Sequence, residues 1–152
     1  MRISAKGDYA TRAVLDLAVS HGRGEVSQIR AIAARQGIPE KYLENILLSL
    51  KKAGILQSRR GHNGGYALAR PPELITVGEV VRVIEGHLAP ISCASMTAYQ
   101  ACPSESACGL RSVWVEARNA VAGVLDNTTF KDVMDRSAGG AGGIERMSPL
   151  NN

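Results

Sequence analysis

The apolar positions near the start of the chain repeat with the period of an α-helix. Ala10, Ala13, Val14 and Leu17 lie at positions i, i+3, i+4 and i+7, which puts all four on one helical face. We therefore expect a first helix over about residues 6–20, with its apolar face turned towards a core. The glycine-containing run that follows ends this helix.

Two shorter helices are expected next, joined by a tight turn. Gly37 ends a helix of about residues 28–36, and Pro39 suits the first turn of a helix that continues to about residue 53. Helix, tight turn and helix in this order predict a helix-turn-helix, whose second helix presents its outer face to the major groove of DNA. The residues expected on its buried face are Leu43, Ile46, Leu47 and Leu50.

A β-hairpin is expected directly after these helices. Residues 55–59 and 66–69 alternate loosely between apolar and polar side chains, and the turn between them, residues 60–65, is rich in glycine. Pro71 and Pro72 end the second strand. The sequence therefore predicts a winged helix: a mainly α-helical fold with a small β-hairpin wing.

The second half of the chain begins with another helix. Thr76 and Glu79 have the spacing of a capping box, which predicts a helix that runs to about residue 85. Residues 86–108 lack clear periodicity and are expected to form a loop. A last short helix is expected over about residues 130–136.

A long helix over about residues 104–125 is predicted to dimerise the protein. Apolar residues recur along it at steps of four and three, as in a coiled coil, and a single helix with such a seam requires a partner helix. We therefore predict a homodimer. The seam consists of Leu110, Trp114, Ala117, Val121 and Val124.

These elements suggest three parts. Residues 1–72 form a winged helix-turn-helix DNA-binding domain, and residues 73–136 carry the loop and the dimerisation helix. Residues 137–152 contain a run of glycines and end in two asparagines, a composition typical of a disordered tail.

The charge is distributed unevenly between the two halves. Residues 1–70 contain 12 Lys and Arg against 5 Asp and Glu, whereas residues 71–152 contain 6 against 9. A basic half favours a polyanionic partner such as double-stranded DNA. No apolar run approaches the roughly 18 residues of a membrane span, and residues 1–6 do not resemble a secretion signal, so we expect a cytoplasmic protein with no membrane partner.

Candidate DNA contacts come from the second helix of the helix-turn-helix and from the wing. Glu44 can accept a hydrogen bond from a cytosine amino group, Asn45 can pair with an adenine edge, and lysines suit phosphates. Arginines beside the glycines of the wing suit a narrow minor groove. The alternative is a solvated helix face beside a hairpin with incidental arginines. The predicted DNA-binding residues are Arg2, Lys6, Lys41, Tyr42, Glu44, Asn45, Lys51, Arg59, Arg60, Gly61 and Asn63.

All three cysteines of the chain, Cys93, Cys102 and Cys108, lie in one window with the spacing C-x8-C-x5-C. Thiolates bind zinc or iron–sulfur clusters, but a structural zinc site favours closer pairs and four protein ligands. Three thiolates with a weaker fourth ligand therefore suit an iron–sulfur cluster better. The alternative is three ordinary cysteines, buried or reactive. Candidate fourth ligands are Asp8, His87, Glu105 or a residue of a second subunit.

Three segments of the chain resemble a known family. The opening MRISAKGDYATRAVLDLA, the block QGIPEKYLENILLSLKKAGILQSRRGHNGGYALAR and the segment ITVGEVVRVIEG, followed by spaced cysteines, are similar to the IscR/NsrR/CymR family of dimeric winged-helix transcriptional regulators. The resemblance covers about residues 1–136. It implies that residues 42–44 read bases, that Arg60 enters the minor groove, and that the three cysteines bind a cluster.

The chain also departs from parts of this family. IscR-like members carry a histidine ligand three residues after the third cysteine, where this chain has Arg111. Some NsrR-like members use an aspartate near the N-terminus of the partner subunit, and Asp8 occupies that position, so the resemblance favours Asp8 as the fourth ligand. The alternative role of Asp8 is a carboxylate that stabilises a helix N-terminus by about 0.3–1 kcal/mol. The long gap between the first two cysteines leaves the cluster type, 2Fe-2S or 4Fe-4S, open.

We therefore expect a DNA-binding transcriptional regulator whose operator affinity is controlled by an iron–sulfur cluster that senses iron–sulfur, redox or nitric oxide status. The alternative is a regulator of cysteine or sulfur metabolism that has no cluster and acts as a thiol switch or by docking a partner enzyme. The sequence contains no paired-carboxylate or nucleophile–base motif, so an enzyme is not expected.

Overall fold

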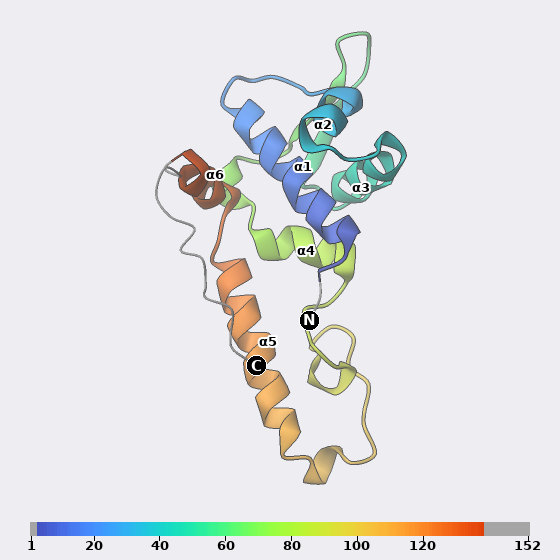
Figure 1. Ribbon diagram of the computed structural model, residues 1–152, viewed down its shortest axis with the longest axis vertical. Coiled ribbons are helices and arrows are strands. Elements are labelled where there is room, and N and C mark those ends of the chain that lie inside the picture. Colours follow the sequence, from blue (N-terminus) through green and yellow to red (C-terminus); the bar gives the residue numbers. More distant parts are fainter. Residues whose placement is uncertain (1–2, 139–152) are drawn as a thin grey trace.

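The computed structural model describes residues 3–138, and within this range the chain is mainly helical with one two-stranded hairpin (Figure 1). Arg2 and residues 139–152 of the predicted disordered tail lie outside the described residues, whereas residues 137 and 138 of that tail are the last residues of a helix. The α-helices and strands are α1 (Ala5–His21), α2 (Ile29–Gln36), α3 (Glu40–Lys52), β1 (Leu56–Arg59), β2 (Gly65–Leu68), α4 (Val77–Glu85), α5 (Leu110–Asp126) and α6 (Phe130–Ala138). Short 3-10 turns are η1 (Pro72–Leu74), η2 (Ser92–Ala94) and η3 (Glu105–Ala107).

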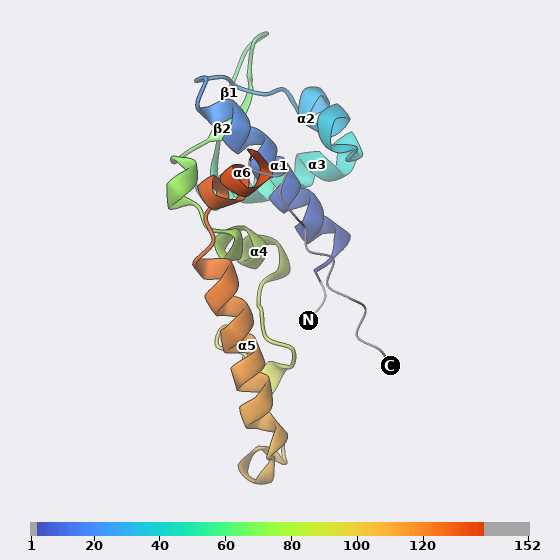
Figure 2. The same ribbon diagram turned by 60° about the vertical axis from the view of Figure 1, so that its left-hand side comes forward.

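The molecule has two regions of different character (Figures 1 and 2). We call residues 3–85 and 127–138 the head, in which α1 is surrounded by the other helices and the hairpin. We call residues 86–126 the arm, in which α5 extends away from the head with the cysteine loop beside it. The hydrophobic core lies in the head.

The predicted helix-turn-helix and wing are confirmed. Gly37 ends α2 in the left-handed conformation, with φ 62° and ψ 38°, which a residue with a side chain rarely adopts. Pro39 immediately precedes α3 rather than lying in its first turn. The strands pair antiparallel with Leu56 opposite Leu68. The four predicted apolar residues of α3 are fully buried.

The segment before α2 extends the wing by one further pairing. Ser27 and Tyr66 exchange two backbone hydrogen bonds of 2.9 Å each. A Cβ atom at Gly65 would lie only 2.5 Å from the carbonyl oxygen of Ser27, so this close approach requires glycine. The wing is therefore fixed to the start of α2 as well as to the end of α3.

The core continues beyond residue 72 into α4 and α6. Ile75, Val80 and Phe130 pack with α1 and α3 in one buried cluster. The capping box of α4 forms only in part: Thr76 Oγ1 accepts a hydrogen bond from the Glu79 amide, but the Glu79 carboxylate accepts one from Arg70 at 2.5 Å instead of turning back.

The start predicted for the long helix was wrong. The helix begins at Leu110 rather than near residue 104, because Ser104 precedes only the 3-10 turn η3 and Gly109 precedes α5. Along its 17 residues α5 buries no side chain against its own chain. Its exposed apolar residues include Leu110, Val113 and Val124.

Candidate nucleic-acid interface and cysteine loop

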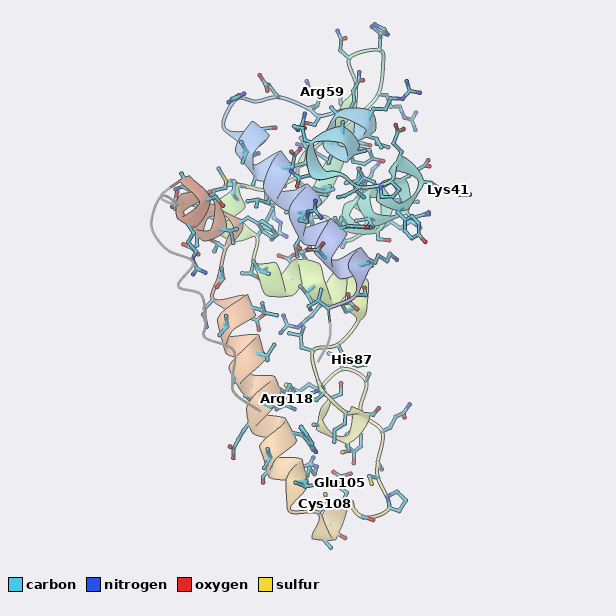
Figure 3. The ribbon with its side chains drawn as sticks, in the orientation of Figure 1. Lys41, Arg59, His87, Glu105, Cys108 and Arg118 are labelled. Atoms are coloured by element: carbon cyan, nitrogen blue, oxygen red, sulfur yellow. The ribbon has the colours of Figure 1, made fainter. Side chains whose placement is uncertain are left out.

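Five of the predicted DNA-binding residues of α3 and the wing line one concave surface. A groove of about 770 Å³ runs between the start of α2, the outer face of α3 and the wing. Figure 3 places Lys41 and Arg59 on this side of the head, remote from the cysteine loop. The residues of the predicted set that line the groove are Lys41, Glu44, Arg59, Arg60 and Gly61.

The outer face of α3 is free to contact a ligand. Tyr42 is 63% exposed, and Glu44 and Asn45 are exposed next to it. The Asn45 side chain donates to the carbonyl of Lys41 at 3.3 Å, a weak local contact that base pairing could replace. Lys51 differs, because its ammonium donates to Ser58 Oγ at 2.6 Å and so connects α3 to β1.

The remaining predicted DNA contacts are exposed outside the groove lining. Lys6 lies in the first turns of α1, and Asn63 lies in the turn of the wing. Neither side chain is fixed by a side-chain hydrogen bond among the described residues.

The groove is also lined by residues that the sequence analysis missed, among them Gln28, Arg30, His62 and Tyr66. Gln28 Nε2 donates to the carbonyl of His62 at 3.3 Å, which joins the start of α2 to the turn of the wing. The sequence signal for Gln28 is weak, because a polar residue before a helix is usual. Arg30 adds a cation on the exposed side of α2 and lies 3.7 Å from Glu40.

A buried carboxylate on α1 stabilises the position of the helix-turn-helix. Asp16 on α1 accepts hydrogen bonds from Arg35 Nε at 2.8 Å and Arg35 Nη2 at 2.6 Å, and a third from Gln36 Nε2 at 3.1 Å. The Asp16 hydrogen bonds raise the pKa of Arg35 above its ordinary value. This bidentate pair fixes the orientation of α2 on α1, and therefore the position of the groove.

The three cysteines are free thiols along the arm. Cys93 lies in η2 and Cys108 just before α5, both half-buried, while Cys102 is exposed. Among residues 3–138, no three His, Cys, Asp or Glu side chains come close enough together to bind one metal ion. Figure 3 shows Glu105 and Cys108 at the end of the arm farthest from the head.

Glu105 organises the tip of the cysteine loop. Its Oε2 accepts a hydrogen bond from the Tyr99 hydroxyl at 2.7 Å, and its Oε1 lies 2.7 Å from Arg111 Nε. The Cys102 amide also approaches Oε2, at 3.5 Å. The Tyr99 hydrogen bond lowers the pKa of Glu105 and raises the pKa of Tyr99, as expected when a phenol donates to a carboxylate. Arg111, which stands where IscR-like members carry a histidine ligand, pairs with Glu105.

Asp8 lies on α1, in the head. It forms an ion pair of 3.4 Å with Arg12 one turn later and lines an apolar groove of about 560 Å³ that also includes Leu125. Leu125 is near the C-terminal end of α5, whereas Cys108 precedes its N-terminal end. A 17-residue helix is about 25 Å long, so Asp8 and Cys108 of one chain lie too far apart to bind the same cluster.

The predicted seam of α5 lies beside, and partly overlaps, the face that contacts the chain's own loop. Arg118 Nη1 donates to the carbonyl of Ala94 at 2.5 Å, and Arg111 faces Glu105. Leu110 and Ala117 of the seam precede these positions by one residue, which places them about 100° around the helix. Leu110 and Val124 are exposed, and the three seam residues between them are half-buried.

No helix of the described residues is both long and apolar enough to cross a membrane.

A winged helix with a basic groove is typical of a DNA-binding transcriptional regulator. Comparison with known proteins gives the same class. The Rrf2 family, described as an iron-dependent transcriptional regulator, matches residues 3–136. The HTH-type transcriptional regulator CymR of Bacillus subtilis is 35% identical, over 91% of this chain and 94% of its own. Protein rrf2 of Nitratidesulfovibrio vulgaris is 40% identical, over 88% and 87%.

Solved structures give the same result. The structure of CymR, the global cysteine regulator of B. subtilis, superposes with a TM-score of 0.73 at 34% identity, covering 89% of this chain and 97% of that one. T. potens IscR superposes with a TM-score of 0.71 at 36% identity, covering 90% and 88%. The chain therefore belongs to the Rrf2 family of transcriptional regulators, which confirms the resemblance seen in the sequence. The names of these relatives agree with the expectation that it is not an enzyme.

Proposed function

We propose that this chain is a homodimeric DNA-binding regulator whose operator affinity is set by an iron–sulfur cluster on the arm. The observation that carries the proposal is the placement of three free thiols within one 16-residue window that leads into α5, a helix with several exposed apolar residues. Membership of a family described as iron-dependent supports a metal centre.

The donor set fits a cluster in its chemistry. Cys93, Cys102 and Cys108 would supply three thiolates, and none of them is engaged in a disulfide. A bound cluster would supply a group sensitive to oxidants and nitric oxide. The fourth ligand would be Asp8 of the partner subunit.

The geometry of α5 supports this use of a partner's carboxylate. Asp8 and Leu125 line the same groove, so Asp8 lies near the C-terminal end of its own α5. If two α5 helices pair antiparallel through their seams, the start of one lies against the end of the other. Cys108 then approaches Asp8 of the partner subunit, which the 25 Å length of α5 prevents within one chain.

The DNA-binding part of the proposal rests on the groove between α3 and the wing. Lys41, Arg59 and Arg60 give it a positive rim, while Glu44 and Asn45 present the acceptor and amide groups that discriminate bases. In a two-fold dimer, two such grooves would contact half-sites about one helical turn apart, roughly 34 Å.

Ordering of the cysteine loop would affect the DNA-binding groove through contacts within the chain. The Arg118 guanidinium connects the loop at Ala94 to α5, and α5 joins the head at its other end. Cluster binding would fix residues 93–108, and therefore the contacts that α5 makes with its partner. Loss of the cluster would release them.

The test is a visible absorption spectrum of protein purified without oxygen, with iron and sulfide assays. We expect charge-transfer bands and near-stoichiometric iron, both lost in Cys102→Ala. Ser104→Ala, an exposed substitution in the same loop, is the matched control and should keep both. Protein that stays colourless and iron-free after attempted reconstitution would contradict the cluster.

A second candidate, a thiol switch without a cluster, is favoured by one observation. Glu105 joins Tyr99 and Arg111 at the tip of the loop through contacts between protein side chains. CymR, a cysteine regulator, is among the similar structures. A colourless protein whose operator affinity changes with reversible oxidation of Cys102 would establish this alternative and leave the DNA-binding proposal unchanged.

A further inference from the structure

The connection between the arm and the head contains a buried glycine and a bidentate ion pair. Asp126 is the last residue of α5, and its two carboxylate oxygens accept from Arg82 Nη1 at 2.5 Å and Arg82 Nη2 at 2.7 Å. Arg82 lies on α4 of the head. A Cβ atom at Gly78, one helical turn before Arg82, would overlap Asp126 Oδ1.

The glycine is explained by this approach rather than by its backbone. Gly78 is buried and is not among the glycines with positive φ in the described residues, so a residue with a side chain could adopt its conformation. A side chain at position 78 would, however, leave no room for the Asp126 carboxylate. Gly78 therefore creates the space in which the end of α5 meets the start of α4.

Asp126 is also placed against the preference of its own helix. A carboxylate in the last turn of a helix faces the negative end of the helix dipole, which is unfavourable. The same carboxylate lies over the first turn of α4, where the dipole is positive, and pairs with Arg82. The interactions that favour this placement are therefore those between the arm and the head.

A second connection lies two to four residues further along the chain. The carbonyl of Thr128 accepts from the Val77 amide at 2.9 Å, and the Phe130 amide donates to the carbonyl of Ile75 at 2.9 Å. These two backbone bonds fix the position at which the chain leaving α5 joins the head, and Leu125 of α5 lines a groove with Val77 and Val81 of α4. The ion pair gives α5 a second point of attachment on α4, and two points set a direction.

We propose that Gly78, Arg82 and Asp126 form a joint that sets the angle between α5 and the head, and thereby the spacing of DNA half-sites that the dimer accepts. This inference rests on the proposed function, because it requires a dimer that binds through α5. A tilt of about 10° at one end of a helix of about 25 Å moves the other end by about 4 Å, and one base pair rises about 3.4 Å. A small change at the joint therefore misplaces one head by about one base pair.

The experiment uses full-length protein purified without oxygen. Duplexes that the wild type selects from a random pool give the operator, and derived duplexes carry one half-site or a spacing altered by one base pair. Asp126→Asn keeps the shape of the side chain and removes its charge, while Gly78→Ala inserts a methyl group into the joint. Asp135→Asn is the matched control, because Asp135 pairs with Lys131 at 2.5 Å within α6 alone.

We expect both joint variants to bind the operator about tenfold more weakly and to bind the half-site within twofold of wild type, with a smaller preference for the selected spacing. The control should match the wild type in all three. The proposal is overturned if a variant loses affinity equally for the operator and the half-site. It is also overturned if Asp126→Asn keeps the spacing preference of the wild type. If Gly78→Ala does not fold, Asp126→Asn decides alone. A wild type without any spacing preference overturns the proposed dimeric function itself.

Discussion

The head and the arm are stabilised by different means. The head buries a continuous apolar cluster in which Leu17, Leu47 and Phe130 are almost fully removed from solvent. The arm buries only Leu88, Ala89, Ala94 and Ser95 and no side chain of α5, and the contacts of α5 with its own loop include the polar bonds of Arg118 and Arg111. Burial of apolar surface stabilises by about 25 cal/mol per Å², whereas exposed polar contacts contribute little. The head can therefore maintain its own fold, and the arm depends on what binds it.

This difference explains how one chain can combine a fixed DNA-binding surface with an adjustable geometry. The groove between α3 and the wing is supported by partly buried bonds, such as those of Asp16 with Arg35. The arm carries the thiols and the apolar seam, so a cluster or a partner changes the arm first. We expect substitutions in the head to affect folding, and substitutions in the arm to affect assembly.

The largest expected effect is on folding of the head. Leu47→Ala removes a fully buried side chain of α3 and should lower the free energy of unfolding by about 2–5 kcal/mol. Leu110→Ala makes the same change at a position of the arm that is 61% exposed. It should change the free energy of unfolding by less than about 0.5 kcal/mol at concentrations where the chain is monomeric. Denaturant titration of both variants measures the two changes in the free energy of unfolding. Equal losses would contradict the difference between the head and the arm.

A smaller effect is expected on assembly. Trp114→Glu places a charge in the predicted seam of α5 and should weaken the dimer at least a hundredfold, about 3 kcal/mol, while the head remains folded. Ser112→Glu adds the same charge on the opposite side of the helix and is the control. Sedimentation across a concentration series gives the dissociation constants. A Trp114→Glu dimer as tight as wild type would place the interface elsewhere.

The DNA-binding surface should respond more modestly. Arg60→Ala removes an exposed cation from the groove and should weaken operator binding by about 1–3 kcal/mol, roughly 5- to 150-fold. Arg136→Ala removes the same charge from α6, outside the groove, and controls for net charge. Fluorescence anisotropy at two salt concentrations measures both, and equal losses in the two variants would argue against a specific contact at Arg60.

The smallest effect concerns acid stability of the joint. Arg82 donates to Asp126 and lowers the pKa of that carboxylate below its ordinary value of 3.8. A lowered pKa stabilises the folded state above the unfolded value, and this stability is lost as pH falls through the folded value. Because Asp126 is partly exposed, we expect no more than about 1 kcal/mol. Asp126→Asn should therefore flatten the fall in stability between about pH 5 and pH 3, as urea titrations would measure.

Much of the head followed from local patterns in the sequence. The period of the apolar residues predicted α1 and α3 to within a residue or two, and Gly37 marked the turn between α2 and α3. The hairpin followed from its glycines, with Gly65 required at the position where the wing meets Ser27. These features depend on a few neighbouring residues, so the sequence alone contains the relevant information.

The arm was predicted less well, because its structure depends on distant partners. Ser104 and Glu105 resemble a helix start, yet the Glu105 carboxylate pairs with Tyr99 and Arg111, and the chain turns once before α5 begins. The pair between Arg82 and Asp126 spans 44 residues and has no local signal. The same limit applies to Gln28, whose contact with the wing depends on the packing of the hairpin.

The central claim is that a cluster on the arm controls the affinity of the head for DNA. The most direct test is to measure operator affinity before and after the cluster is removed. Wild type purified without oxygen is titrated with operator, then stripped of iron by chelator and titrated again beside Cys102→Ala. We predict that stripping changes the wild-type affinity about tenfold or more, and that Cys102→Ala already has the stripped value. Identical affinities in the loaded, stripped and Cys102→Ala proteins, with half-site binding intact, would contradict the claim.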